Sequence, residues 1–173
     1  MKEYIIYGIL GFIILLILIY FIMWLVVYIK LNKSYKKLDV NLKRRLELLS
    51  MYLEMIYDSF LQEQAALIAI NSIKDKLKES LDVNEYFEIN ARLSEELQRI
   101  FNSVLNYPEL RNKENFDSVH NELNELEKSI DTNRKIYNGC ANKFNLRMSK
   151  FPFKIFKSKE RSLYVTKYDR FNS

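Results

Sequence analysis

The first thirty residues of the chain differ sharply from the rest in their pattern of apolar and charged positions. No charged residue occurs from Tyr4 to Ile29. At about 1.5 Å per residue, a helix of this length crosses a hydrocarbon core of about 30 Å. Aromatic rings, which favour the lipid headgroup level, stand near its two ends: Tyr4, Tyr7, Trp24 and Tyr28. The pattern predicts a transmembrane helix over residues 4–29, preceded by a short terminus over residues 1–3.

Positive charge gathers on the C-terminal side of this apolar run. Before the run Lys2 is offset by Glu3, whereas after it Asp39 alone stands against a series of cations: Lys30, Lys33, Lys36, Lys37, Lys43, Arg44 and Arg45. Under the positive-inside rule, the chain after the run stays in the cytoplasm and the N-terminus faces outward from the cell membrane. A cleaved signal sequence fits poorly, because the run is long and no small-residue cleavage site follows it.

Beyond residue 30 the apolar positions become periodic, with charged residues between them. They recur at three, four or seven residues, which predicts amphipathic helices. A first long helix carries Leu38, Leu42, Leu49, Leu53, Ile56 and Phe60. Its stripe continues through Ile70, Ile73 and Leu77 to about Ser80, either straight or bent near residues 62–66. Neither Gly nor Pro separates this helix from the membrane segment, so the two could form one continuous helix.

Two further helices are predicted after a break near residues 81–85. One carries Ile89, Leu93, Leu97, Ile100 and Val104. It stops near Tyr107-Pro108, because the residue before a proline is biased away from helical geometry. The other follows a polar loop over residues 109–114 and ends before Phe151-Pro152. Its stripe is Phe116, Val119, Leu123, Leu126, Ile130, Tyr137 and Phe144.

The predicted fold class is therefore all-α, with an N-terminal transmembrane helix followed by an antiparallel three- to four-helix bundle of long helices. The bundle covers residues 30–150, and a bend in the first long helix would give it a fourth member. The chain has only 3 Gly and 2 Pro, which favours long helices over a many-stranded sheet.

The last segment, residues 151–173, interleaves basic and aromatic residues. From Lys150 onward the cations are Lys150, Lys154, Lys157, Lys159, Arg161, Lys167 and Arg170, and the rings are Phe151, Phe153, Phe156, Tyr164, Tyr168 and Phe171. Two interpretations stay open: a tail at the membrane interface, with rings inserted and cations facing anionic lipid headgroups, or a solvated extension. Binding of RNA is a third, weaker interpretation. The formal net charge of +5 gathers near the predicted bilayer, which favours lipid over nucleic acid as the partner.

The sequence offers little for catalysis. It contains no HExxH, GxSxG or P-loop motif. A di-iron bundle needs two Glu-x-x-His motifs, and His120 is the only histidine. We expect Cys140 to be a small helix-packing side chain and His120 to be a polar helix position. The expectation is a protein that is not an enzyme and has no catalytic, cofactor or metal site.

Three sequence blocks carry a resemblance to a known family. The first is Leu38-Asp39-Val40-Asn41-Leu42-Lys43-Arg44-Arg45; the second is Tyr107-Pro108-Glu109-Leu110-Arg111-Asn112-Lys113-Glu114-Asn115-Phe116; the third is Arg134-Lys135-Ile136-Tyr137-Asn138, followed by Phe144-Asn145 and Phe151-Pro152. In this order, after an N-terminal membrane helix, they resemble the bacterial LemA family over residues 38–156. The resemblance implies a helical bundle on a single transmembrane anchor and supplies no catalytic residues.

The blocks contain the residues that we single out as structural or interaction sites: Lys43, Arg44, Arg45, Tyr107, Pro108, Asn112, Asn115, Phe116, Arg134, Tyr137, Asn138, Phe151 and Pro152. The basic cluster over residues 43–45 could contact lipid headgroups. The preferred interpretation is that it pairs within the bundle with Glu122, Glu125 or Glu127 on the last helix.

The loop block has a structural interpretation. We expect Tyr107 and Phe116 to pack across the loop and to fix the antiparallel turn. Asn112 and Asn115 are expected to satisfy backbone groups there, and one of them could cap the start of the last helix.

For function, the sequence favours a non-enzymatic, membrane-anchored scaffold or adaptor of the LemA type. Its expected partners are the lipid bilayer, anionic lipid headgroups and unidentified membrane or cytoplasmic proteins, and no cofactor is expected. The alternatives are a membrane-linked sensor or regulator and a coiled-coil protein of the cell envelope or of cell division.

Overall fold

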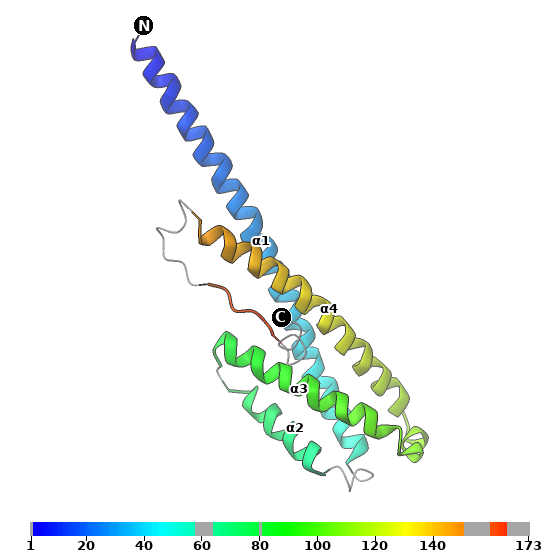
Figure 1. Ribbon diagram of the computed structural model, residues 1–173. Helices are drawn as coiled ribbons and strands as arrows, with labels where there is room; N and C mark the ends of the chain where they lie inside the picture. Colours follow the sequence, from blue (N-terminus) through cyan, green and yellow to red (C-terminus); the bar gives the residue numbers. More distant parts are fainter. Residues whose placement is uncertain (1, 58–63, 80, 151–159, 166–173) are drawn as a thin grey trace.

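The computed structural model describes residues 2–57, 64–79, 81–150 and 160–165, and this part of the chain is helical with no strand. In order, its helices are α1 (Lys2–Ile56), α2 (Gln64–Lys76), α3 (Val83–Val104), the 3-10 helix η2 (Pro108–Asn112) and α4 (Phe116–Met148) (Figure 1). The all-α prediction is confirmed. The predicted bend near residues 62–66 falls where α2 begins, so the stripe that starts on α1 continues on a separate helix.

The membrane segment and the first amphipathic helix form one uninterrupted helix, α1, of 55 residues. Its N-terminal half projects beyond the other helices (Figure 1). This half is long and apolar enough to cross a membrane, and none of the residues in its most apolar stretch is buried within the protein. Leu31 is the first residue of α1 buried against the rest of the chain. The change from exposed to buried therefore occurs at the end of the apolar run, without a break in the helix.

Helices α1 and α4 run antiparallel over most of the length of α4. Residue numbers on α1 fall as those on α4 rise through successive contacts: Arg44 with Glu122, Asn41 with Ser129, Tyr35 with Tyr137, and Tyr28 with Phe144. One further contact continues this order: the Arg147 guanidinium, near the end of α4, donates to the Met23 carbonyl oxygen at 2.8 Å. Helix α3 lies beside this pair, and α2 packs mainly on α3 (Figure 1).

The apolar stripes meet in two clusters of buried residues. The proximal cluster, nearer the apolar half of α1, comprises Leu31, Leu38, Leu42, Phe87, Ala91, Ile130, Tyr137, Ala141, Phe144 and Tyr164. The distal cluster comprises Leu48, Leu49, Tyr52, Leu53, Ile56, Leu67, Ile70, Leu93, Leu97, Ile100, Phe101, Val104, Leu110, Phe116, Val119 and Leu123. On each of α1, α3 and α4, the two clusters occupy successive parts of one apolar face.

The loop between α3 and α4 closes the distal cluster. Phe116 is buried in it and Tyr107 is partly buried against it, as expected of residues that pack across the loop. Leu110, on η2, is completely buried in the distal cluster, so the stretch predicted as a polar loop over residues 109–114 contains an apolar anchor. The Lys113 ammonium donates to the Met55 carbonyl oxygen at 2.6 Å, which ties the loop to the last turn of α1.

The capping prediction for this loop is wrong. Asn115 occupies the N-cap position of α4, but its side chain makes no capping hydrogen bond. Its backbone is left-handed, with φ of 61°, whereas a side chain that caps a helix projects from an extended backbone. Asparagine suits the position because it tolerates left-handed geometry. The exposed Asn112 ends η2 and does not cap α4.

Candidate functional site

A buried polar network lies between the two apolar clusters and is centred on Arg45. The Arg45 side chain is 0% exposed. Its Nη1 donates to Ser94 Oγ at 2.7 Å and to Glu127 Oε1 at 3.0 Å, and its Nη2 donates to both oxygens of Asn90. One guanidinium thus joins α1, α3 and α4.

The network keeps its charge although it is buried. Burial alone would lower the pKa of Arg45, but the Glu127 carboxylate and the nearby phenols of Tyr164 and Tyr86 hold the pKa above its ordinary value. A buried charge without its partners is costly, so the bonds of Arg45 to Glu127, Ser94 and Asn90 favour the arrangement in which α1, α3 and α4 meet.

A short segment near the C-terminus completes the site. Residues 160–165, here called the strap, run beside α3 and α4 (Figure 1). The Tyr164 ring is 1% exposed and stacks on Phe87, with centroids 5.0 Å apart and an interplanar angle of 4°. Burial raises the pKa of the Tyr164 phenol, and the charge of the nearby Arg45 opposes this rise in part. Tyr164 is thus buried within the protein, and neither the lipid-inserted nor the solvated interpretation of the tail holds at this residue.

Two asparagines on α4 hold the strap by its backbone. The Asn138 amide donates to the Tyr164 carbonyl oxygen at 2.8 Å and accepts from the Tyr164 N–H at 2.9 Å. Asn145 makes the same pair of bonds with Arg161, at 3.0 and 2.9 Å. Each side-chain amide therefore satisfies the donor and the acceptor of one strap residue, as a neighbouring β-strand would.

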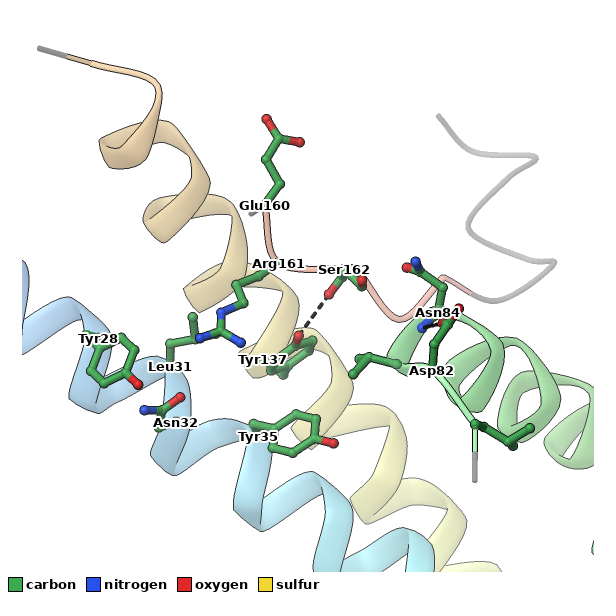
Figure 2. Close-up of a pocket in the computed structure, with 12 residues that line it drawn as sticks. Tyr28, Leu31, Asn32, Tyr35, Asp82, Asn84, Tyr137, Glu160, Arg161 and Ser162 are labelled. Carbon is green, nitrogen blue, oxygen red and sulfur yellow. Dashed lines mark hydrogen bonds between the residues drawn. The ribbon is translucent and has the colours of Figure 1, made fainter. Parts of the chain in front are cut away.

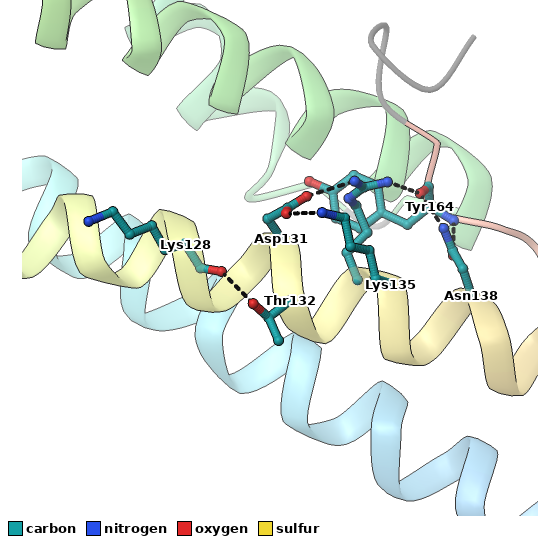
Figure 3. Close-up of polar contacts among 7 residues, drawn as sticks. Lys128, Asp131, Thr132, Lys135, Asn138 and Tyr164 are labelled. Atoms are coloured by element: carbon teal, nitrogen blue, oxygen red, sulfur yellow. Dashed lines mark hydrogen bonds and ion pairs between the residues drawn. The ribbon is translucent and has the colours of Figure 1, made fainter. Parts of the chain in front are cut away.

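Further polar contacts reinforce this arrangement. The Tyr137 hydroxyl donates to the Ser162 carbonyl oxygen at 2.8 Å. Arg134 donates from Nη1 to the Tyr164 carbonyl oxygen at 3.4 Å and from Nη2 to Asp131 at 2.7 Å. Figure 3 shows Asp131 beside the strap, paired also with Lys135 at 2.7 Å. Burial alone would raise the pKa of Asp131, but its hydrogen bonds with these two cations hold it below the ordinary value.

A cavity of about 700 Å³ opens beside the strap. Its lining comes from α1 (Tyr28, Leu31, Asn32 and Tyr35), from the start of α3, from Tyr137 on α4 and from strap residues 160–162 (Figure 2). The Arg161 guanidinium lies 5.7 Å from the centroid of the Phe144 ring, a cation–π contact. The strap thus forms one wall of a cavity just beyond the apolar half of α1.

The basic cluster over residues 43–45 lies partly on the surface and partly in the core. Arg44 pairs with Glu122 at 3.1 Å and Arg45 with Glu127 at 3.0 Å, two of the acids named from sequence. The Arg44 pair is half-exposed, so it contributes little to stability. Lys43 is exposed and pairs with Asp39 within α1 at 2.7 Å. Only Arg45 belongs to the buried site.

The third block builds the strap contacts, since Arg134, Tyr137 and Asn138 all reach the strap backbone. Phe151 and Pro152 lie outside the described residues. Asn145, Asn90 and Ser94 also belong to the site, although the sequence predicted no role for them. The spacing held a signal for Asn145, which follows Asn138 by two helical turns and therefore shares its face of α4.

The remaining candidates for chemistry are packing residues. His120 Nδ1 lies 2.8 Å from the Tyr52 hydroxyl, and its ring stacks on Phe116. Burial lowers the pKa of His120, opposed in part by Asp117. Cys140 packs against the proximal cluster, as expected. Within the described ranges, no group of three or more His, Cys, Asp or Glu side chains could hold a metal ion.

Comparison with known proteins identifies a family. No curated protein matches the chain. The family model of the LemA family matches residues 34–171, most of the chain, and spans the basic block, the η2 loop, the α4 block and the strap. The resemblance seen in the three sequence blocks is therefore confirmed, and the chain belongs to the LemA family.

Proposed function

We propose that this protein is a single-pass membrane protein whose helical bundle organises partner proteins at the cytoplasmic face of the cell membrane. In this proposal the bundle is a scaffold or adaptor without catalytic activity of its own. Membership of the LemA family supports the class of protein, and the form of α1 supports the anchoring.

The observation that carries the anchoring is the unburied apolar half of α1. Its side chains from Tyr4 to Ile19 are all exposed. Exposing apolar surface to water costs about 25 cal/mol per Å², whereas a hydrocarbon core covers it. A helix that is apolar on every side and unburied by its own protein fits a bilayer better than solvent.

The cations that follow the apolar run support the cytoplasmic orientation. Lys30, Lys33, Lys36 and Lys37 are exposed within the first turns beyond it. Each cation near an anionic membrane surface contributes about 1 kcal/mol of attraction. Because α1 continues unbroken into the bundle, the same helix would hold the bundle upright at the lipid surface.

Labelling with a membrane-impermeant thiol reagent tests the anchoring and its direction. On a Cys140→Ala background, a Ser149→Cys chain should resist the reagent in intact cells and react after lysis. A Lys2→Cys chain on the same background should react in intact cells. The reverse pattern would contradict the orientation, and recovery of the chain in the soluble fraction would contradict the anchor.

Crosslinking in cells tests the scaffold proposal. A photo-crosslinking residue at Ile136 or Leu146, both exposed on α4, should capture recurrent protein partners that mass spectrometry identifies. A crosslinker at Ile9, in the apolar run, is the matched control for contacts that follow only from residence in the membrane. If the α4 positions capture no protein beyond those captured at Ile9, the bundle is not a scaffold.

A further inference from the structure

We propose that the groove that holds the strap also accepts residues 160–165 of a second copy of this chain, so that neighbouring copies join by exchanging straps. The inference rests on the proposed function in one respect, because anchoring in a shared membrane brings the copies together.

The groove recognises an extended peptide chiefly through its backbone. Asn138 and Asn145 are two helical turns apart, about 10.5 Å along α4. The residues they hold, Tyr164 and Arg161, are three apart in the strap, which is about 10 Å of extended chain. The two amides therefore match the repeat of an extended segment that runs antiparallel to α4. The Tyr137 hydroxyl also donates to the carbonyl oxygen of Ser162, which lies between Arg161 and Tyr164 in the strap.

Two side chains of the strap add selectivity. The Tyr164 ring occupies an enclosed position, stacked on Phe87. Arg161 lies over the Phe144 ring. A segment of the second copy presents the same groups at the same spacing, so every contact of the strap with the groove can be repeated between two chains.

The length of the connecting chain also allows exchange. Asn145, which holds Arg161, lies little more than one helical turn before Lys150. The segment that joins Lys150 to Glu160, residues 151–159, can reach roughly 30 Å when extended. The connection is thus much longer than the return to the chain's own groove requires, and it does not restrict the strap to that groove.

Concentration decides between the two arrangements. A strap joined to its own groove by the nine residues 151–159 has an effective concentration in the millimolar range, so dilute copies keep their own straps. Exchange is expected when copies are crowded in one membrane, or when a chain's own strap and groove no longer fit each other.

A pair of full-length variants tests the exchange. Tyr164→Asp removes the ring that stacks on Phe87 and so releases the strap, leaving the groove intact. Asn138→Trp fills the groove where Tyr164 is held, leaving the strap intact. The variants, labelled with donor and acceptor dyes, are placed together in phosphatidylethanolamine–phosphatidylglycerol vesicles. Energy transfer in the mixture should exceed that of either variant alone by about tenfold, because only the mixture contains a matched strap and groove.

Two controls define the contact. Combining both substitutions in one chain and mixing it with the Asn138→Trp chain should abolish energy transfer, because no intact groove remains. A synthetic peptide of residues 157–168 should compete with the exchanged strap and reduce energy transfer in the original mixture. Energy transfer that survives either control would arise at another surface and would overturn the proposal.

The remaining outcomes separate this inference from the proposed function. If both variants stay helical by circular dichroism and float with the vesicles, yet the mixture shows no energy transfer, strap exchange is wrong and the anchor stands. If the Tyr164→Asp chain then binds the peptide, the groove takes an extended segment of a different protein instead. If neither chain floats with the vesicles, the anchoring itself is wrong, and exchange promoted by a shared membrane is overturned with it.

Discussion

The proximal and distal clusters both draw on α1, α3 and α4, with α2 added in the distal one, but they are completed in different ways. The distal cluster is closed locally by the η2 loop, which supplies Leu110 at the turn between α3 and α4. The proximal cluster needs the strap, which supplies Tyr164 from beyond the end of α4. The Arg45 network separates the two along α1, α3 and α4. The same long helices thus carry one cluster completed by the loop between them and another completed by a segment from beyond the end of α4.

The largest expected effect comes from removing the residue that separates the clusters. Arg45→Ala leaves Glu127 and Asn90 without their cation and opens a cavity in a fully buried position. We expect a loss of about 5 kcal/mol in the free energy of unfolding, measured by urea titration of the full chain in detergent. Arg44→Ala, which removes a half-exposed partner of Glu122, is the matched control and should cost less than about 1 kcal/mol. Equal effects would show that Arg45 is not a central contact.

The distal cluster is expected to be nearly as sensitive but for an apolar reason. Phe116 is 1% exposed and stacks on Tyr52 with centroids 5.7 Å apart. Phe116→Ala should cost about 3–5 kcal/mol through lost burial and the cavity left behind. In the folded Phe116→Ala chain, the contacts of the strap with α4 should remain as in the wild type. A negligible loss of stability would contradict the packing of the loop.

A smaller effect is expected from one strap contact. Asn138→Ala removes the two hydrogen bonds to the Tyr164 backbone. The loss should be about 1–3 kcal/mol, confined to the proximal cluster, because the Tyr164 N–H loses its partner and the carbonyl oxygen keeps only the longer bond from Arg134. Asn142→Ala, an exposed asparagine one turn along the same helix, should leave stability unchanged. If the two substitutions behave alike in urea titration, the Asn138 amide does not hold the strap.

The apolar architecture could be predicted from the sequence, whereas the proximal site could not. Leucines at helical spacing identified α1, α3 and α4, because burial of a stripe is a local pattern. Arg45 falls on that stripe, three residues after Leu42 and four before Leu49, and this was the available signal that it points inward. The surrounding sequence obscured the signal, since Lys43 and Arg44 make the residue look like part of a surface cluster.

The strap was beyond sequence reasoning for a physical reason. Its contacts join Asn138 and Asn145 to backbone atoms of Tyr164 and Arg161. Because every residue has the same backbone groups, the sequence does not indicate which of them will be bound. Its interleaved rings and cations equally suit a lipid surface. The capping prediction for Asn115 was wrong for another reason. Asparagine is a common helix-capping residue, but the residue type does not show that the backbone at this position is left-handed.

The smallest predicted effect is a pH dependence in the distal cluster. Burial depresses the pKa of His120 in the folded chain below its ordinary value near 6.5. The unfolded chain therefore binds the proton more readily, and stability contributed by neutral His120 is lost as the pH falls from about 6.5 through the folded pKa. Melting temperatures at pH 7.5 and 5.5 should differ less for His120→Gln than for the wild type. An unchanged difference would assign the pH dependence to other groups.

The central claim, that α4 holds the strap by its backbone, is tested most directly by hydrogen exchange at two amides of the full-length chain. The Tyr164 and Arg161 N–H groups each donate to an asparagine side chain of α4. Both should exchange slowly in the wild type. Asn138→Ala should accelerate exchange at Tyr164 by at least about tenfold, corresponding to about 1.4 kcal/mol, while Leu53 in the distal cluster keeps its protection. Exchange of both strap amides at the rate of an unstructured peptide in the wild type would contradict the account.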